Sequence, residues 1–122
     1  TLNAFTASTD IIIPLVSEVL PFKGLTMIND FINIVRRKLN PQAHITGILI
    51  TRWEGSKLSK GIEDKLREAV GSLVFNSRIR KNIRLAEAPL ENRSILDYDK
   101  NCNGAKDYLS FTDEFLNRME QA

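Results

Sequence analysis

The sequence has few of the residues from which metal sites and nucleophilic sites are built. Its 122 residues include one cysteine, Cys102, and one histidine, His44. A lone cysteine excludes an internal disulfide and a cysteine-built zinc site, and it is typical of a reducing compartment. No CxxC or HxxxH spacing is present, so we expect no metal site. His44 follows a proline turn at the start of an apolar run, where a capping or solvent-facing role is commoner than a catalytic one.

The sequence also contains neither a membrane span nor the pattern of a secretion signal. The longest apolar run, Ile11–Val16, contains Pro14 and is far shorter than the roughly 20 residues that cross a bilayer. Thr1–Asp10 is polar and has no basic residue, unlike the start of a signal peptide. We therefore expect a cytoplasmic location without membrane contact.

The chain has no large excess of charge and no glycine-rich phosphate loop. Its formal net charge is +2, so any anion-binding surface has to come from local clustering of cations. Neither GxxxxGKS/T nor GxGxxG occurs in the sequence. Hydrolysis of a nucleotide by the usual P-loop route is therefore excluded for this chain alone.

What the chain does have is an alternation of apolar runs with amphipathic segments. The expected strands are 10–16, 44–51 and 73–79, the expected helices are 22–39 and 58–70, and an irregular stretch through Pro89 to Asn103 precedes a closing helix from Gly104. This order predicts an α/β fold, a parallel sheet flanked by helices, in a single domain over residues 1–122. A sheet of only three strands leaves an edge unpaired, and the first residue is not Met, so we expect a fragment of a longer protein.

Apolar residues spaced three and four apart indicate which face of each helix packs on the sheet. The first helix has Leu25, Ile28, Ile32, Val35 and Leu39, and the second has Leu58, Ile62, Leu66 and Val70. The closing helix has Ala105, Tyr108, Leu109, Thr112, Phe115, Leu116 and Met119.

Candidate ligand-binding residues follow the strands, because ligands collect beyond the carboxyl ends of the strands in open parallel sheets. The loops concerned follow Val16, Thr51 and Ile79. The second loop, TRWEG (Thr51–Gly55), offers a guanidinium, an indole and a carboxylate that could face a base or a ribose. The alternative is that the indole packs on the following helix while the two charged side chains face water. The sequence leaves both interpretations open.

The third loop contains the basic segment SRIRKNIRLAEAP (Ser77–Pro89). Its four cations are Arg78, Arg80, Lys81 and Arg84. On an extended segment Arg78 and Arg80 share one face, and cations held in place are sufficient to bind phosphates. The alternative is a solvated loop that Glu87, Glu91 and Asp97 neutralise locally.

Three motifs, in matching order, resemble the ParA/Soj branch of the deviant P-loop ATPases. RKNIRLAEAP, followed by SILDYDKNCNGAKDYL, is similar to that family's IPRNVRLSEAP, its PVLEYD-like stretch and its G-A-x-x-Y helix. LNPQAHITGILITRWEG resembles the family's LNPxLxIxGILxTMYDG. TLNAFTASTDIIIPLVSEVLPFKGL resembles the segment that follows the Walker B aspartate. The resemblance covers essentially the whole chain.

The resemblance implies a P-loop NTPase-like fold, of which this chain is the C-terminal part. Family members act in plasmid or chromosome partitioning, bind ATP and Mg²⁺, form face-to-face dimers, bind DNA nonspecifically and respond to a ParB-type partner protein. They are cytoplasmic and nucleoid-associated. Because the chain begins downstream of the Walker A, switch I and Walker B motifs, we expect it to have no catalytic residues, to be inactive as an ATPase alone and to hold no cofactor tightly. The alternative is a non-catalytic DNA- or partner-binding module on the same fold.

A membrane-cycling MinD-like protein of the same superfamily is a further alternative. It would carry a basic amphipathic tail, whereas this chain ends in FLNRMEQA with mixed charge. We therefore expect no membrane partner.

The resemblance also suggests roles for individual residues. Two groups match the border of the adenine, namely Thr51, Arg52, Trp53 and Glu54, and Arg80, Lys81 and Asn82. Arg84 matches an arginine of the DNA-binding surface, to which Arg78, Arg80 and Lys81 would contribute, and Glu18 matches a glutamate near the dimer face. Two departures are notable: Arg80 stands where the family has proline, and Glu54 stands where it has aspartate.

Overall fold

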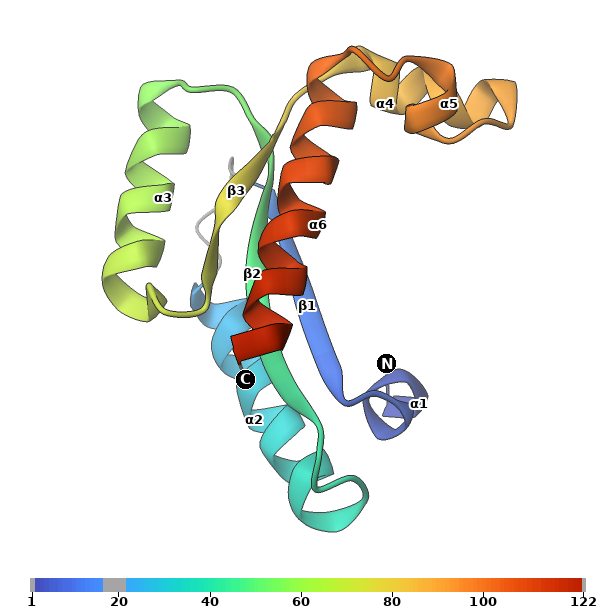
Figure 1. The fold of residues 1–122 in the computed structure, drawn as a ribbon. Coiled ribbons are helices and arrows are strands. Elements are labelled where there is room, and N and C mark those ends of the chain that lie inside the picture. The colour runs from blue at the N-terminus through green and yellow to red at the C-terminus, as the bar shows by residue number, and fades with distance from the viewer. Residues whose placement is uncertain (1, 17–21, 122) are drawn as a thin grey trace.

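A parallel three-stranded sheet forms the centre of the molecule (Figure 1). The computed structural model describes residues 2–16 and 22–121. Within them, β1 (Asp10–Val16), β2 (His44–Trp53) and β3 (Val74–Arg80) pair in the order β1-β2-β3. The predicted fold class, a parallel sheet flanked by helices, is confirmed.

Helices cover both faces of this sheet (Figure 1). Helices α2 (Phe22–Lys38) and α3 (Lys57–Val70) pack on one face, where Ile32, Val35 and Leu66 join the buried strand residues of the larger core cluster. On the opposite face, Phe111 and Phe115 of α6 (Asn103–Gln121) pack against a smaller cluster of Leu49, Phe75 and Ile79. Alternation of side chains along β2 and β3 places apolar residues on both faces, which is why helices are needed on each.

Short helices occupy segments for which the sequence predicted no helix. Residues Leu2–Ala7 form α1, and α4 (Ile83–Glu87) lies within the basic segment. The stretch expected to be irregular contains the 3₁₀ helix η1 (Ala88–Glu91) and α5 (Ile95–Tyr98). The prediction of an irregular stretch was therefore wrong over these residues. The local cause is capping: Asn82 and Ser94 each accept a hydrogen bond from a backbone N–H in the first turn of the helix that follows.

The buried face of α6 also differs from the prediction. Tyr108, Leu109, Leu116 and Met119 are between 37% and 52% exposed. The side facing the sheet instead includes three polar residues, Asp107, Glu114 and Arg118. Glu114 accepts hydrogen bonds from the backbone N–H groups of Asn76 and Ser77, and Arg118 donates to the carbonyl groups of Thr46, Leu73 and Val74. Polar side chains occupy this face because they bind the backbone of the sheet, a use that apolar periodicity cannot reveal.

Two other predicted packing residues, Leu39 and Leu58, are 56% and 59% exposed. The side chains of Leu25 and Ile28, and the residue Glu18, lie outside the part of the chain that the structure describes. Among the described helices none is both long enough and apolar enough to cross a bilayer.

Candidate functional site

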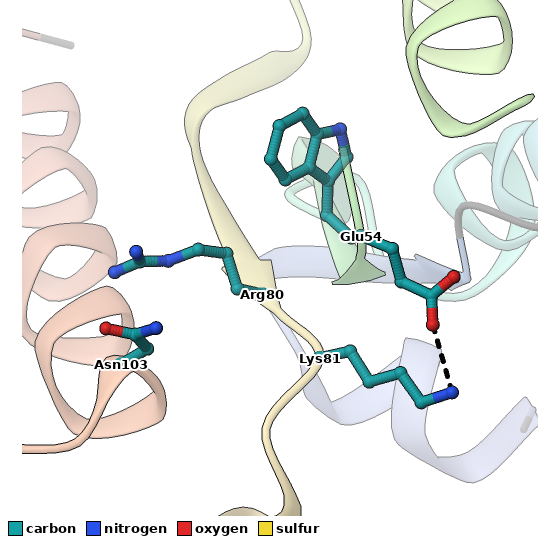
Figure 2. A pocket seen from close by; sticks show the side chains of 5 residues that line it. Glu54, Arg80, Lys81 and Asn103 are labelled. Carbon is teal, nitrogen blue, oxygen red and sulfur yellow. Dashed lines mark ion pairs between the residues drawn. The ribbon is translucent and has the colours of Figure 1, made fainter. Parts of the chain in front are cut away.

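The carboxyl ends of β2 and β3 bring together the two segments that the sequence singled out. The backbone N–H of Lys81 donates to the carbonyl of Trp53 at 3.0 Å, which ties the segment after β3 to the end of β2. Around this link lies a hollow of about 320 Å³ bordered by Trp53, Glu54, Arg80, Lys81 and Asn103, which we call the polar hollow. Figure 2 shows Arg80 extending toward Asn103 at the start of α6, with Glu54 and Lys81 paired on the opposite side.

A second hollow, of about 600 Å³, also borders Lys81. Most of its walls are apolar, so we call it the apolar hollow. Its lining residues are Thr51, Arg52, Ile79, Lys81, Asn82, Ile83, Leu85, Ala86 and Tyr108. The seven residues expected at the adenine are thus divided between the two hollows, and only Lys81 borders both.

Arg80 is fixed to α6 by Asp107. Its guanidinium makes a two-pronged contact, with Nε 3.0 Å from Oδ2 and Nη2 2.8 Å from Oδ1, and its backbone N–H donates to Oδ2 at 2.8 Å. Hydrogen bonding to Asp107 raises the pKa of Arg80 above its ordinary value. Proline, which the resemblance would favour at this position, has no N–H to donate. The arginine and Asp107 therefore make a connection between β3 and α6 that proline could not make.

Arg78 is held by a different carboxylate, that of Glu63 on α3. Glu63 is 5% exposed, and Nε of Arg78 and Nε of Arg67 both lie 2.8 Å from its oxygens. Burial alone would raise the pKa of Glu63, but the hydrogen bonds and charges of Arg78 and Arg67 outweigh it, so this pKa lies below its ordinary value. Although alternation puts Arg78 and Arg80 on one face of β3, they bind partners on two different helices.

Trp53 takes part in packing. Its ring packs against the larger core cluster, and the guanidinium carbon of Arg78 lies 4.5 Å from the ring centroid. Gly55, with a positive φ of 74°, turns the chain so close to the indole that a Cβ there would lie 3.2 Å from the ring. These contacts support the interpretation in which Trp53 packs against the protein, rather than the one in which it faces a base or a ribose.

The remaining two cations of the basic segment are exposed. Nζ of Lys81 lies 3.0 Å from Oε1 of Glu54, and Arg84 lies 3.4 Å from Glu87 and 3.5 Å from Asp99. Asn82 positions Arg84 by capping α4 through the Arg84 N–H. Among the ion pairs of the basic segment described here, Glu87 is the one partner that the sequence predicted. The other acidic partners lie on α3, on α6 and in neighbouring loops.

Asn103 borders the polar hollow and Tyr108 borders the apolar hollow, and neither residue was assigned to a site from the sequence. Both belong to the first two turns of α6, and the placement of that helix start beside the strand ends is a tertiary feature. His44 lies at the other end of β2, exposed, with Nε2 3.2 Å from Asp10. In the described ranges no cluster of three histidine, cysteine or acidic side chains is placed to hold a metal ion.

Solved structures with the same fold support this architecture. Cobyrinic acid a,c-diamide synthase from Mycobacterium smegmatis, with bound ADP and magnesium, superimposes with a TM-score of 0.72 at 22% identity, over 95% of this chain and 41% of that one. This likeness extends to the fold, a parallel α/β arrangement in which helices flank the sheet.

The chain also has sequence relatives among named partitioning proteins. Chromosome partitioning protein ParA of Caulobacter vibrioides is 34% identical over 97% of this chain and 45% of its own length. Chromosome-partitioning ATPase Soj of Thermus thermophilus is 32% identical over 100% of this chain and 49% of its own length. No family model matches. The chain is a relative of the ParA/Soj partitioning proteins and spans about half their length, which confirms the resemblance found in its motifs.

Proposed function

We propose that the chain is the C-terminal part of a ParA-type ATPase that acts in plasmid or chromosome partitioning. The observation that carries this proposal is the extent of the match: relatives named for partitioning are 34% and 32% identical across 97% and 100% of the chain. The order of strands, helices and motifs also fits such a protein.

In this proposal the complete protein binds ATP with Mg²⁺ and dimerises, and this chain contributes the side of the site that faces the base. The sequence holds no glycine-rich phosphate loop, so the isolated chain would hold no nucleotide tightly. The candidate residues are the seven that line the two hollows at the carboxyl ends of β2 and β3, where parallel sheets present ligands.

We further propose that the complete protein binds DNA nonspecifically on the nucleoid, in the cytoplasm, and works with a ParB-type partner. Lys81 and Arg84 are the best candidates among the four cations for phosphate contacts, because the side chains of their acidic partners are 33–40% exposed and a phosphate could compete with them. Arg78 and Arg80 are bound to the nearly buried carboxylates of Glu63 and Asp107, so their role would be to support this surface.

The test is DNA binding as a function of salt, on this chain and on the ATP-loaded protein that contains it. A Lys81→Ala/Arg84→Ala variant is compared with Lys60→Ala/Lys65→Ala, which removes the same charge from the exposed side of α3. Loss of two phosphate contacts should lower the slope of log K against log salt by about two for the first variant. Equal losses in both variants, or no binding with or without ATP, would refute the DNA assignment. DNA binding that is equally strong with and without ATP would favour the alternative function, a non-catalytic DNA- or partner-binding module.

A further inference from the structure

The last turn of α2 contains the only run of three consecutive cations in the sequence, Arg36, Arg37 and Lys38. All three residues are exposed. Among the residues that the structure describes, no carboxylate forms an ion pair with any of them. Asp30, the nearest acidic residue on the same helix, precedes Arg36 by six residues, or about 9 Å along the axis. The described part of the chain therefore leaves the positive charge of this turn unneutralised.

The basic segment differs from the end of α2 in this respect. Each of its four cations is paired with at least one carboxylate. A phosphate that approaches the basic segment has to compete with those carboxylates, whereas a phosphate at the end of α2 displaces none that the described residues supply. Exposed cations without acidic partners are the groups that exchange most readily with the counterions of a nucleic acid.

The end of α2 and the basic segment lie at opposite ends of the sheet (Figure 1). Nε of Arg36 donates to the carbonyl of Ala43 at 2.7 Å, directly before β2 begins. At the other end of β2, the N–H of Lys81 donates to the carbonyl of Trp53. The ten residues of β2, at about 3.3 Å each, separate these two points by about 30 Å. The two surfaces are therefore too far apart to contact the same phosphate.

The open arrangement of the α2 cations suits the backbone of duplex DNA. None of the three borders the polar hollow or the apolar hollow. A small anion needs donors that converge on it, whereas a duplex presents one charge per about 1.7 Å and is held by an open row of cations. The apolar stripe of α2, which includes Ile32 and Val35, is buried against the sheet, so it is not available to insert into a bilayer.

We propose that the last turn of α2 is a second DNA-backbone surface, in which Arg37 and Lys38 contact phosphates independently of the basic segment. Arg36 positions this turn through its hydrogen bond to Ala43. The inference rests on the DNA binding proposed above and deepens it by adding a surface at the opposite end of the sheet. Because the two surfaces are far apart and share no partner, their contributions to binding should add.

The experiment is a salt series of duplex-DNA titrations on this chain and on the ATP-loaded protein that contains it. Arg37→Ala/Lys38→Ala removes the two charges, and Arg37→Lys/Lys38→Arg keeps them. Lys60→Ala/Lys65→Ala removes the same charge from the exposed side of α3 and is the matched control. Arg36 is left in place because it holds the turn before β2. Urea denaturation of each variant separates a loss of helix stability, which removal of cations from the negative end of a helix dipole can cause, from a loss of DNA contacts.

We expect Arg37→Ala/Lys38→Ala to lower the slope of log K against log salt by about two and to weaken binding at least about tenfold near 0.1 M salt. The charge-keeping variant should bind like the unchanged protein, and the α3 variant should change little. Equal losses in the α2 and α3 variants, unchanged binding in Arg37→Ala/Lys38→Ala, or no DNA binding with or without ATP would overturn the inference. Binding to vesicles of anionic lipid without binding to DNA would overturn it in favour of a membrane surface.

The same titrations distinguish failure of this inference from failure of the proposed function. If Lys81→Ala/Arg84→Ala lowers the salt slope and Arg37→Ala/Lys38→Ala does not, the DNA assignment of the basic segment stands and the second surface is refuted. If the reverse is found, the second surface stands and the basic segment loses its assignment. A variant with all four substitutions should lower the slope by about four, because the two surfaces contact different phosphates.

Discussion

The two halves of the basic segment use the same kind of side chain for different purposes. Arg78 and Arg80 lie within β3 and pair with Glu63 and Asp107, which are 5% and 9% exposed. Lys81 and Arg84 follow the strand and pair with carboxylates whose side chains are 33–40% exposed. Pairs of the first kind are expensive to break because a buried charge is left behind, whereas exposed pairs contribute little. A run of cations in a sequence therefore does not say how many of them are available to a ligand.

The largest effect should come from removing the carboxylate that holds Arg78. We expect Glu63→Gln to lower the free energy of unfolding by about 2–3 kcal/mol, below the full cost of a broken buried pair because Arg67 and Arg78 are 28% and 40% exposed. Urea denaturation measures it. Glu68→Gln, at an exposed position of the same helix, is the control and should change little. If both variants were equally stable, the distinction between the two halves of the segment would be lost.

Acid should weaken the same contact. The pKa values of Glu63 and Glu114 both lie below their ordinary value, because bound arginines and, for Glu114, the N–H groups of Asn76 and Ser77 outweigh the effect of burial. A carboxylate with a depressed folded-state pKa adds stability that is present above its unfolded pKa, about 4.3, and lost as pH falls through the folded pKa. The free energy of unfolding should therefore decrease as the pH is lowered below about 4.

Urea denaturation between pH 3 and pH 6 checks this, with Glu63→Gln as the comparison. The variant lacks one of the two carboxylates, so its stability should decline less steeply as pH falls. A steeper decline in the variant would contradict the assignment to Glu63.

Asp107→Asn should have a smaller effect, because the amide oxygen can still accept from the Arg80 N–H. The side chain of Arg80 is 42% exposed, so we expect a loss of about 1 kcal/mol in the free energy of unfolding. A double-mutant cycle with Arg80→Ala isolates the coupling between the two side chains. Additive losses in that cycle would show that Arg80 and Asp107 act independently.

The features of the fold that could be predicted from the sequence are those set by neighbouring residues in the chain. The three strands and α2 and α3 follow from apolar runs and spacings of three and four, and Ile32, Val35 and Leu66 are buried as expected. The inward face of α6 did not follow, because Asp107, Glu114 and Arg118 bind the sheet through its backbone and through Arg80, and polar residues ordinarily indicate a solvated face.

The candidate site was predictable to a similar extent. The rule that ligands meet the carboxyl ends of parallel strands brought the segments after β2 and β3 together. It could not show that they border two hollows, because that division depends on α4 and on the first turns of α6. Asn103 and Tyr108 reach the strand ends only through the placement of α6, and no spacing in the sequence encodes it.

The smallest effect on stability should come from the exposed half of the segment. Lys81→Ala removes an ion pair whose members are 53% and 40% exposed, so we expect the free energy of unfolding to change by less than about 0.5 kcal/mol. In the DNA-binding protein that we propose, the same change should weaken binding and lower its salt dependence, because one phosphate contact is lost. Thermal unfolding and a salt series of DNA titrations on the same preparation measure both quantities. If Lys81→Ala instead cost as much stability as Glu63→Gln and left DNA binding intact, the two halves of the segment would have exchanged roles.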